Sequence, residues 1–284
     1  MSAQAAQLGE PIKGPSALGD SPQRLWHLTR TLAVSDFKLR FFGSVLGYLW
    51  QLMRPLLLFG VLYIVFTQIV RIGGEVELYP VALLLGIVLF TFFSEATGGA
   101  VSSLVDRESL IRKVDFPRLA VPLSTVLTAL FNVALNLGAV LLFLMIAGGR
   151  VRLSWIEVPF LVLALAVLCA GLGMLLSALY VRYRDVKPIW EVALQILFYG
   201  SPIFYPIDAV IERSEPAAKL MMLNPFAAIL QQTRHALVAP SHPSVADVLG
   251  SNALVLVPVA IGVAVIGLGY VVFKRNAPRI AEQL

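Results

Sequence analysis

Charged residues are scarce in this sequence. Only 14% of its 284 residues are charged, whereas 58% are hydrophobic, and the mean hydropathy is +0.82. Soluble domains carry about 25% charged residues, so this chain has too little polar side-chain surface to face water on all sides. The composition therefore predicts an integral membrane protein, whose structural unit is a spanning helix of about 20 residues.

Cysteine and histidine are also nearly absent. The single cysteine, Cys169, lies inside an apolar run, so an intrachain disulfide and a metal cage of several thiolates are both excluded. Of the three histidines, His235 and His242 are separated by Pro240 and do not share one helix face. We therefore expect no metal site, and we interpret His27, His235 and His242 as exposed or interfacial side chains.

The common catalytic motifs are missing as well. The sequence contains no GxxxxGK(S/T), HExxH or GxSxG pattern, so the chain has no P-loop with which to hold the phosphates of ATP. The outer loops between the apolar runs carry too few acids, bases and nucleophiles for a catalytic constellation. We expect neither a catalytic residue nor a cofactor in this chain.

Long apolar runs, in contrast, are abundant. Six of them are long enough to cross a hydrocarbon core about 30 Å thick. The expected fold is an all-α integral membrane protein with six transmembrane helices, which places both termini on the same side of the membrane. The predicted spans are residues 54–72, 80–104, 119–147, 155–180, 188–206 and 253–273.

The positions of the basic residues predict the orientation of these spans. Sixteen of the 22 Lys and Arg residues lie before residue 55, in loops 105–118 and 182–187, and after residue 273. The positive-inside rule then places both termini and these two loops in the cytoplasm. The net charge of +5 and the pI near 9.5 are thus explained by the basic residues of the cytoplasmic loops. We therefore expect no nucleic-acid partner.

The ends of the chain differ from the transmembrane domain at 49–275. Residues 1–22 have no apolar run long enough for a signal peptide, so we predict a disordered segment. Residues 23–48 have apolar side chains at helical spacing with charges between them, which predicts an amphipathic helix in the cytoplasmic interface. Such a helix either anchors the chain to membrane lipids or offers a surface to a cytoplasmic partner. We expect residues 276–284 to form a cytoplasmic tail.

Two of the predicted cytoplasmic loops are densely charged. Residues 106–118 carry seven charges around an apolar stripe of Leu110, Ile111 and Val114, which predicts a short amphipathic helix. Residues 182–187 end the fourth span in a similar way. Both loops are either ordinary basic loops or docking surfaces for a partner protein.

The outer segment 207–252, between the fifth and sixth spans, is unusual. Residues 216–223 and 226–238 are apolar but only 8 and 13 residues long, which suits re-entrant rather than spanning helices. Asn224 followed by Pro225 is a good start signal for the second of them. We predict a short helical hairpin that dips into the outer leaflet.

Few polar residues lie within the spans, and we expect the following four to be buried. The acids are Glu95 and Glu191, and Asn132 and Asn136 lie four positions apart on one face of the third span. An intramembrane carboxylate is a candidate for function. The alternative is a structural hydrogen bond between helices, such as one from an asparagine of the third span to Glu95.

Aromatic residues form two groups, one in the first span and one in the outer half of the fifth. Rings along a pathway offer sugars a stacking surface without a fixed site, whereas lipid packing and aromatic belts explain such rings equally well. The two groups are Phe59, Tyr63 and Phe66, and Phe198, Tyr199, Phe204 and Tyr205.

Five segments carry a family resemblance. They are DFKLRFFGSVLGYLWQLMRPL at 36–56, LIRKVDFP at 110–117, RYRD at 182–185, SPIFYP at 201–206 and LNPF at 223–226. In the same order, they resemble signatures of the membrane subunits of bacterial type-2 ABC exporters of polysaccharides. The resemblance covers residues 25–275.

This resemblance implies a homodimer of six-span permeases in the bacterial inner membrane, with two copies of a separate P-loop ATPase that binds ATP and Mg²⁺. The implied substrate is a lipid-linked glycan of the O-antigen, capsule, teichoic acid or galactan kind. The aromatic residues of spans one and five would line the channel, and Asn224, Pro225 and Phe226 would form an outer gate. The implied ATPase-coupling residues are Asp36, Lys38, Arg40, Asp106, Arg107, Glu108, Leu110, Ile111, Arg112, Lys113, Arg182, Arg184 and Asp185.

Two other hypotheses stay open at this point. Other type-2 permeases export a small hydrophobic drug or a lipid, and this chain has the features of that wider class. An ion-coupled secondary transporter, which needs no ATPase, would instead use Glu95 and Glu191.

Overall fold

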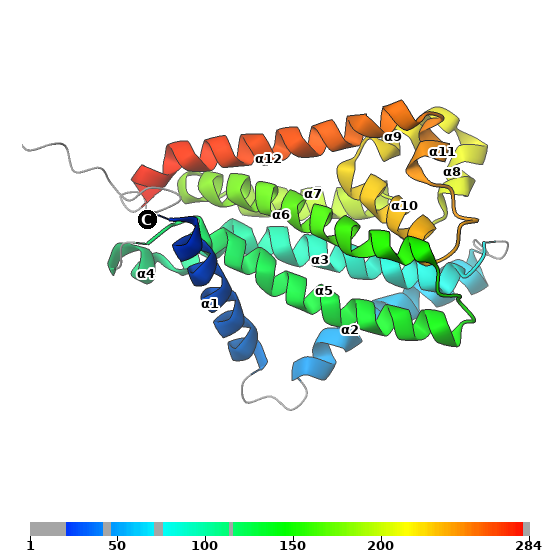
Figure 1. Ribbon diagram of the computed structural model, residues 1–284, viewed down its shortest axis with the longest axis horizontal. Helices are drawn as coiled ribbons and strands as arrows, with labels where there is room; N and C mark the ends of the chain where they lie inside the picture. Colours follow the sequence, from blue (N-terminus) through cyan, green and yellow to red (C-terminus); the bar gives the residue numbers. More distant parts are fainter. Residues whose placement is uncertain (1–20, 42–46, 71–75, 114–115, 281–284) are drawn as a thin grey trace, which may run out of the picture.

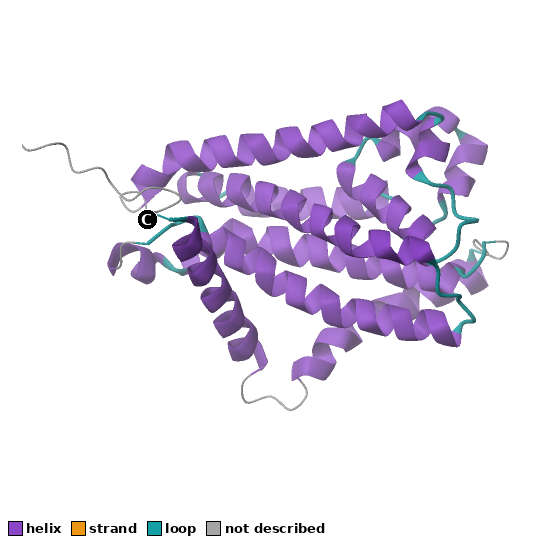
Figure 2. Cartoon of the chain, in the orientation of Figure 1, coloured by secondary structure: helices purple, strands orange, loops and turns teal. Residues whose placement is uncertain are grey.

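The computed structural model describes residues 21–41, 47–70, 76–113 and 116–280 (Figure 1). The described part of the chain forms helices and connecting turns and contains no strand (Figure 2). The prediction of an all-α integral membrane protein is confirmed. Residues 1–20 of the predicted disordered segment, and the last four residues of the predicted tail, lie outside the described residues.

Five helices are long and apolar enough to cross a membrane, and they match five of the predicted spans. Four of them, α3, α5, α6 and α12, run side by side along the long axis (Figure 1). The spans are Leu49–Ile69, made of α2 (Gly47–Ile64) and η2 (Val65–Ile69); α3 (Tyr79–Asp106); α5 (Ala120–Ile146); Leu153–Arg182, made of η3 (Leu153–Ile156) and α6 (Glu157–Arg182); and Asn252–Asn276, made of η4 (Asn252–Val255) and α12 (Leu256–Asn276).

The remaining predicted span, at 188–206, is a shorter helix. Helix α7 (Val186–Gly200) has 15 residues and packs against α3 and α6. At a rise of about 1.5 Å per residue it is about 22 Å long, less than the hydrocarbon thickness. The six-span topology and the cytoplasmic position of the termini therefore stay predictions.

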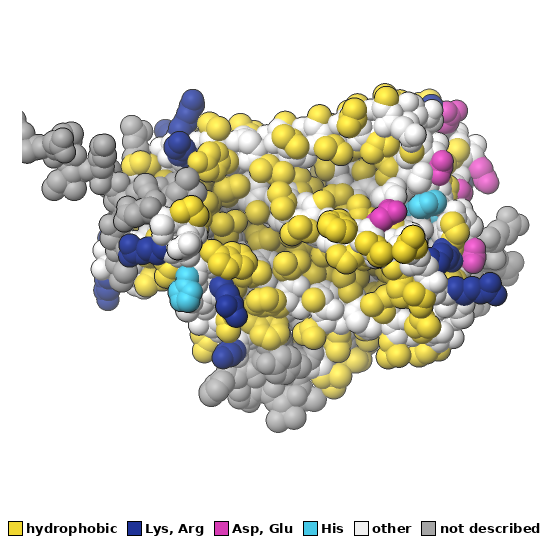
Figure 3. Space-filling view, in the orientation of Figure 1, with side chains coloured by type: hydrophobic (Ala, Val, Ile, Leu, Met, Phe, Trp, Pro, Cys, Tyr) yellow, Lys and Arg dark blue, Asp and Glu magenta, His cyan; other side chains and the backbone are white. Residues whose placement is uncertain are grey.

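Helix α3 forms the core of the bundle. In its most apolar window 72% of the residues are buried, against 6% for the span that contains α2 and 17% for the span that contains α12. The exposed apolar faces of the outer helices suit contact with lipid. On one face of the molecule, hydrophobic side chains cover the middle, and most charged and histidine side chains gather toward the two ends (Figure 3).

The N-terminal helix α1 (Pro22–Phe41) leans against α5 at one end of the bundle (Figure 1). The rings of Phe37 and Phe131 meet edge to face, with centroids 5.7 Å apart. The prediction that this helix continues to Tyr48 is wrong, because α2 already begins at Gly47. From there the sequence is mostly apolar on every face, which suits a spanning helix rather than an amphipathic one.

Short helices fill the outer segment. The expected helix start is confirmed, because the Asn224 Oδ1 accepts the backbone N–H of Phe226 at 3.0 Å and Pro225 occupies the first turn. A capping box of Ser244 and Asp247, a pattern readable in the sequence, begins a helix that was not predicted. The depth of these helices in the membrane stays a prediction. They are α8 (Ile207–Arg213), α9 (Glu215–Met222), α10 (Pro225–Leu237) and α11 (Val245–Leu249).

The backbones of helices α6 and α12 come closest at two glycine residues, one in each helix. A Cβ atom placed on Gly269 would lie 2.1 Å from the carbonyl oxygen of Gly171. A Cβ atom on Gly171 would in turn lie 2.7 Å from the Cα of Ile266. Only residues without a side chain permit this backbone approach, as in other close pairs of membrane helices.

Gly269→Ala should therefore force α12 away from α6. We expect the free energy of unfolding in detergent to fall by about 1–3 kcal/mol, the usual cost of overpacking. Gly267→Ala is the matched control, because apart from the neighbouring backbone of α12 no atom lies within 4 Å of the Cβ position at Gly267. An equal loss in both variants would contradict this view of the contact.

Candidate functional site

The predicted ATPase-coupling residues gather at one end of the bundle, which we term the coupling end (α1, α4 and residues 182–187; Figure 1). The short helix expected between the second and third spans is present as α4 (Glu108–Lys113). Its Ile111 is buried, Leu110 is half-buried, and Arg112 and Lys113 are exposed. Helix α4 is thus attached by its apolar side and presents its basic side outward.

The other coupling residues at this end are mostly exposed. The guanidinium of Arg184 lies over the ring of Tyr180, 5.1 Å from its centroid, and that of Arg182 lies over Tyr183 at 5.2 Å. The side chain of Arg40 lies outside the described residues. The exposed members are Lys38, Asp106, Arg182, Arg184 and Asp185.

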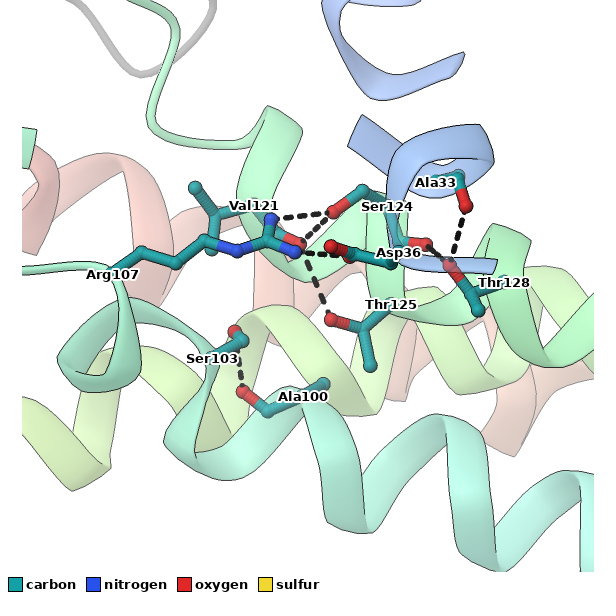
Figure 4. A network of polar contacts seen from close by, with 9 residues as sticks. All are labelled: Ala33, Asp36, Ala100, Ser103, Arg107, Val121, Ser124, Thr125 and Thr128. Atoms are coloured by element: carbon teal, nitrogen blue, oxygen red, sulfur yellow. Dashed lines mark hydrogen bonds and ion pairs between the residues drawn. The ribbon is translucent and has the colours of Figure 1, made fainter. Parts of the chain in front are cut away.

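Arg107, directly after α3, links α1 to α5 (Figure 4). Its guanidinium pairs with the Asp36 carboxylate of α1 and donates to the Ser124 Oγ of α5 at 3.0 Å. One turn along α5, the Thr128 hydroxyl donates to the Ala33 carbonyl of α1 at 3.3 Å. The sequence indicated both Asp36 and Arg107 but not their pairing, because charges 71 positions apart follow no periodic pattern.

A polar groove of about 480 Å³ lies beside this link, between α1, α3 and α5. On its wall the Ser102 hydroxyl donates to the Asp106 carboxylate at 2.8 Å. Its charges are of both signs, so the groove has no strong preference for an anion or a cation. The lining residues are Asp36, Leu39, Gly99, Ser102, Ser103, Asp106, Arg107, Thr125 and Thr128.

Arg107→Gln should loosen α1 from the bundle. The two paired side chains are 21% and 32% exposed, so we expect a cost of only about 1 kcal/mol. The measurement is the rate of trypsin cleavage at Arg30 and Lys38 in inside-out vesicles, which should rise. Arg112→Gln is the control, since Arg112 pairs within α4; equal cleavage rates in both variants would argue against the link.

The aromatic residues of the first and fifth spans meet next to the outer helices. Phe66 in η2 contacts Phe204 in the turn after α7, with ring centroids 4.9 Å apart. Phe204 also contacts Phe198, Tyr199 and Tyr205, at 5.7, 5.9 and 4.9 Å. We term these five rings the outer aromatic cluster. The ring of Tyr199 is its most accessible member, with 68% of the residue exposed.

Two predicted channel residues lie apart from this cluster. Phe59 and Tyr63 stack on each other at 5.6 Å, and Phe59 also meets Phe143 of α5 edge-on at 5.7 Å. The structure therefore brings together five of the seven aromatic residues that the sequence indicated.

The residues predicted as an outer gate pack into the chain. Phe226 is 1% exposed and lies against the rings of Phe90 and Phe93 of α3, at 5.8 and 5.0 Å. The Asn224 cap and Pro225 start α10 so that its first turn faces this core. Within the described chain Phe226 is a core residue, which argues against its expected role as a gate.

Glu95 is hydrogen-bonded between helices. It accepts from the Gln51 Nε2 at 3.2 Å and from the Asn132 Nδ2 at 3.1 Å, and Arg54 lies 3.9 Å away. The expected contact between Glu95 and an asparagine of the third span is confirmed. Asn136 donates to the Asn132 backbone carbonyl at 2.9 Å. This cluster ties the start of α2 to α3 and α5.

Glu191 differs from its expected environment. Its classification as a buried polar residue is wrong, since the side chain is exposed on α7, together with Gln195 one turn further on. The reason is that α7 lies at the edge of the bundle and fully buries only Leu194.

A buried arginine was not foreseen. Arg234 lies in the outer segment and is not among the site residues predicted from the sequence, yet it is only 3% exposed. Its guanidinium donates to the carbonyl oxygens of Ala82, Pro202 and Ile203. Nothing in the local sequence distinguishes this arginine from an exposed one, because its acceptors are backbone groups far away in the chain.

His242 is buried as well, so its interpretation as an exposed or interfacial side chain is wrong. It is 5% exposed, and its Nε2 donates to the Glu77 carbonyl at 3.0 Å. Burial, assisted by the nearby charge of Arg234, lowers the pKa of His242 to about 4. The imidazole is therefore neutral at physiological pH.

This lowered pKa predicts an acid-sensitive outer segment. Above the unfolded pKa of 6.5 the histidine is neutral in both states, whereas between pH 6.5 and 4 only the unfolded chain gains the proton. Stability should therefore fall as the pH drops through this window, by up to about 1.4 kcal/mol per pH unit. His242→Gln keeps a donor for Glu77 and should flatten the dependence of the unfolding midpoint on pH; an unchanged slope would argue against the assignment.

A bundle of apolar helices with charged ends defines a multi-pass membrane protein. The sequence pattern of the ABC-2 type transporter family matches residues 27–238, so the chain belongs to this family. The matched region runs from α1 to the end of α10, and it contains the coupling end, the outer aromatic cluster and Arg234.

Named relatives agree with this membership. The chain is 31% identical over 201 residues to the O-antigen export system permease protein RfbA of Myxococcus xanthus, covering 70% of this chain and 76% of that protein. It is 26% identical over 211 residues to RfbA of Klebsiella pneumoniae, covering 74% and 80%. It is 23% identical over 212 residues to the polysialic acid transport protein KpsM of Escherichia coli, covering 73% and 80%.

Proposed function

We propose that this chain is the permease subunit of an ATP-driven exporter that moves a lipid-linked polysaccharide outward across the bacterial inner membrane. Its family, and its similarity to permeases named for O-antigen export and polysialic acid transport, support this proposal. The observation that carries it is the meeting of Phe66 with Phe204 in the outer aromatic cluster. Aromatic rings attract the apolar faces of sugar rings without fixing one position of the polymer relative to the protein. Such contacts suit a polysaccharide that slides along its pathway.

The proposed exporter is a homodimer with its pathway between the two copies, along α2 and α7. These helices are poorly covered by the rest of the chain, since only 6% of the apolar window of the α2 span is buried and α7 fully buries only Leu194. Glu191 and Gln195 are exposed on α7, and a carboxylate that faces lipid is costly. A second copy or a watery pathway covers such side chains better than hydrocarbon does.

The coupling end is the proposed docking surface for two copies of a separate P-loop ATPase, which would bind the ATP and Mg²⁺. The chain itself has no P-loop pattern. Helix α4 is attached to the bundle through Ile111, and Arg107 joins the start of α4 to α1 through Asp36. A displacement of α4 by the ATPase would therefore move α1 and α5 together with it, as a rigid-body change requires.

A small hydrophobic drug or lipid is the alternative substrate. The exposed Glu191, Gln195 and Tyr199 of α7 favour a polar substrate, because each offers a hydrogen-bonding group on a face that the chain does not cover. A glycan fits this combination of ring and polar group better than a wholly apolar molecule does.

Tyr199→Ala should lower the amount of polysaccharide on the cell surface. Losing one ring contact of about 1 kcal/mol corresponds to about a fivefold decrease, measured with an antibody to the glycan at equal permease levels. Ile196→Ala is the matched control, because Ile196 is also 68% exposed and lies one turn earlier on α7. Equal export in the two variants would speak against an aromatic pathway.

Reversing the charge of α4 should release the ATPase. For Arg112→Glu combined with Lys113→Glu, we expect about a tenfold decrease in the ATPase subunit that co-purifies, because attraction across the docking surface becomes repulsion. The control combines Arg150→Glu and Arg213→Glu, two exposed arginines outside the coupling end. Undiminished co-purification with the α4 variant would contradict the proposed docking surface.

A further inference from the structure

The buried guanidinium of Arg234 is bound by backbone carbonyl groups. Among the described residues it pairs with no carboxylate. It donates to Ala82 of α3 at 3.3 Å, to Pro202, and to Ile203 at 2.5 Å. Burial lowers the pKa of Arg234 to about 10, so the side chain is still protonated at neutral pH. A buried cation is costly unless its surroundings compensate it, which makes these carbonyl contacts strong constraints.

The contacts join three elements that lie far apart in the sequence. Arg234 belongs to α10, Ala82 to the first turns of α3, and Pro202 and Ile203 to the turn that follows α7. Carbonyl groups in a turn have no helical donor of their own, and the planar fork of an arginine can serve two acceptors at once. Lysine carries the same charge but cannot reproduce this fork.

Other side chains hold the next part of the same turn. The Tyr79 hydroxyl of α3 donates to the Phe204 carbonyl at 2.6 Å. The Tyr205 hydroxyl donates back to the Tyr199 carbonyl, at the end of α7, at 3.1 Å. Three successive carbonyls, at residues 202, 203 and 204, thus accept from side chains of α10 and α3.

The site requires a glycine opposite the guanidinium. A Cβ atom at Gly86 of α3 would lie 2.9 Å from the Ile203 carbonyl oxygen and 3.0 Å from the Arg234 Nη2. A side chain at this position would push the turn and the arginine away from α3. Gly86 therefore tests the same contact from the opposite side.

We propose that Arg234 is a positioning residue for the outer aromatic cluster. By fixing the carbonyl groups of Pro202 and Ile203 against α3, it sets where the rings of Phe204 and Tyr205 stand relative to Phe66. The link to transport rests on the proposed function, in which this cluster lines the outer end of the polysaccharide pathway. Through Arg234, α10 and the turn after α7 are held as one unit.

The test measures ring position and export separately. In full-length chains with Cys169→Ala, the pair Phe66→Cys and Phe204→Cys is treated in native membranes with a short bifunctional thiol reagent. Adding Arg234→Lys should lower the cross-linked fraction about threefold or more, because charged hydrogen bonds are lost. Arg213→Lys, at an exposed arginine of α8, should leave it unchanged. Surface polysaccharide is measured in parallel with the native rings in place, and Arg234→Lys should lower it.

Two further variants keep the test decisive. Gly86→Ala should lower cross-linking in the same direction, and the double variant with Arg234→Lys should lose little more than the worse single variant, since both act on one contact. Tyr79→Phe removes only the hydroxyl that binds the Phe204 carbonyl and should give a smaller decrease. If Arg234→Lys does not accumulate in the membrane, Gly86→Ala decides the question, because it disturbs the same contact from the side of α3.

The outcomes separate this inference from the proposed function. Unchanged cross-linking in the variants that reach the membrane at normal levels overturns the positioning role of Arg234. Independent, additive losses in the double variant also overturn it. Reduced cross-linking with normal surface polysaccharide supports the positioning role and contradicts the aromatic pathway instead.

Discussion

The burial of α3 at the centre of the bundle is the constraint on which the rest of the structure depends. Helices α5 and α6 pack along it, its last residues lead into Arg107 and α4, and its first turn binds Arg234 and carries Tyr79, which donates to the turn after α7. Membrane helices gain little from hydrophobic exclusion against lipid, so close packing and interhelical hydrogen bonds hold them together. Both proposed working regions, the coupling end and the outer aromatic cluster, are attached to the two ends of this one helix.

This attachment explains how a chain with so few charges can be organised for transport. The described charges lie mainly at the ends, where the ion pair of Arg107 with Asp36 holds α1 to the bundle and where the basic side of α4 faces outward. Between the ends, Glu95 is satisfied by amides of α2 and α5. The exposed Glu191 of α7 is left on the side that a second copy or a pathway would cover. The few polar side chains thus form their contacts mainly between different helices.

Much of this architecture follows from the sequence, because apolar length and helical period determine spans directly. The predictions for α3 and α5 agree with the observed helices to within two residues at each end. The sequence could not show which surfaces are covered. Glu191 was expected to be buried and is exposed, and Phe226 was expected at an outer gate and is buried in the core. Both assignments were wrong because the sequence of a helix does not show which other helix covers each of its faces. Arg234 was missed for the same reason: its acceptors are backbone carbonyls that come close only after α3, α7 and α10 have packed.

The most direct test of the central claim is transport by the purified chain in proteoliposomes, with and without its ATPase subunit. The substrate is a lipid-linked glycan, and the readout is its appearance on the opposite face of the vesicle. We expect transfer only when both subunits and hydrolysable ATP are present. Transfer by this chain alone, driven by a proton or sodium gradient, would contradict the central claim and would favour an ion-coupled transporter.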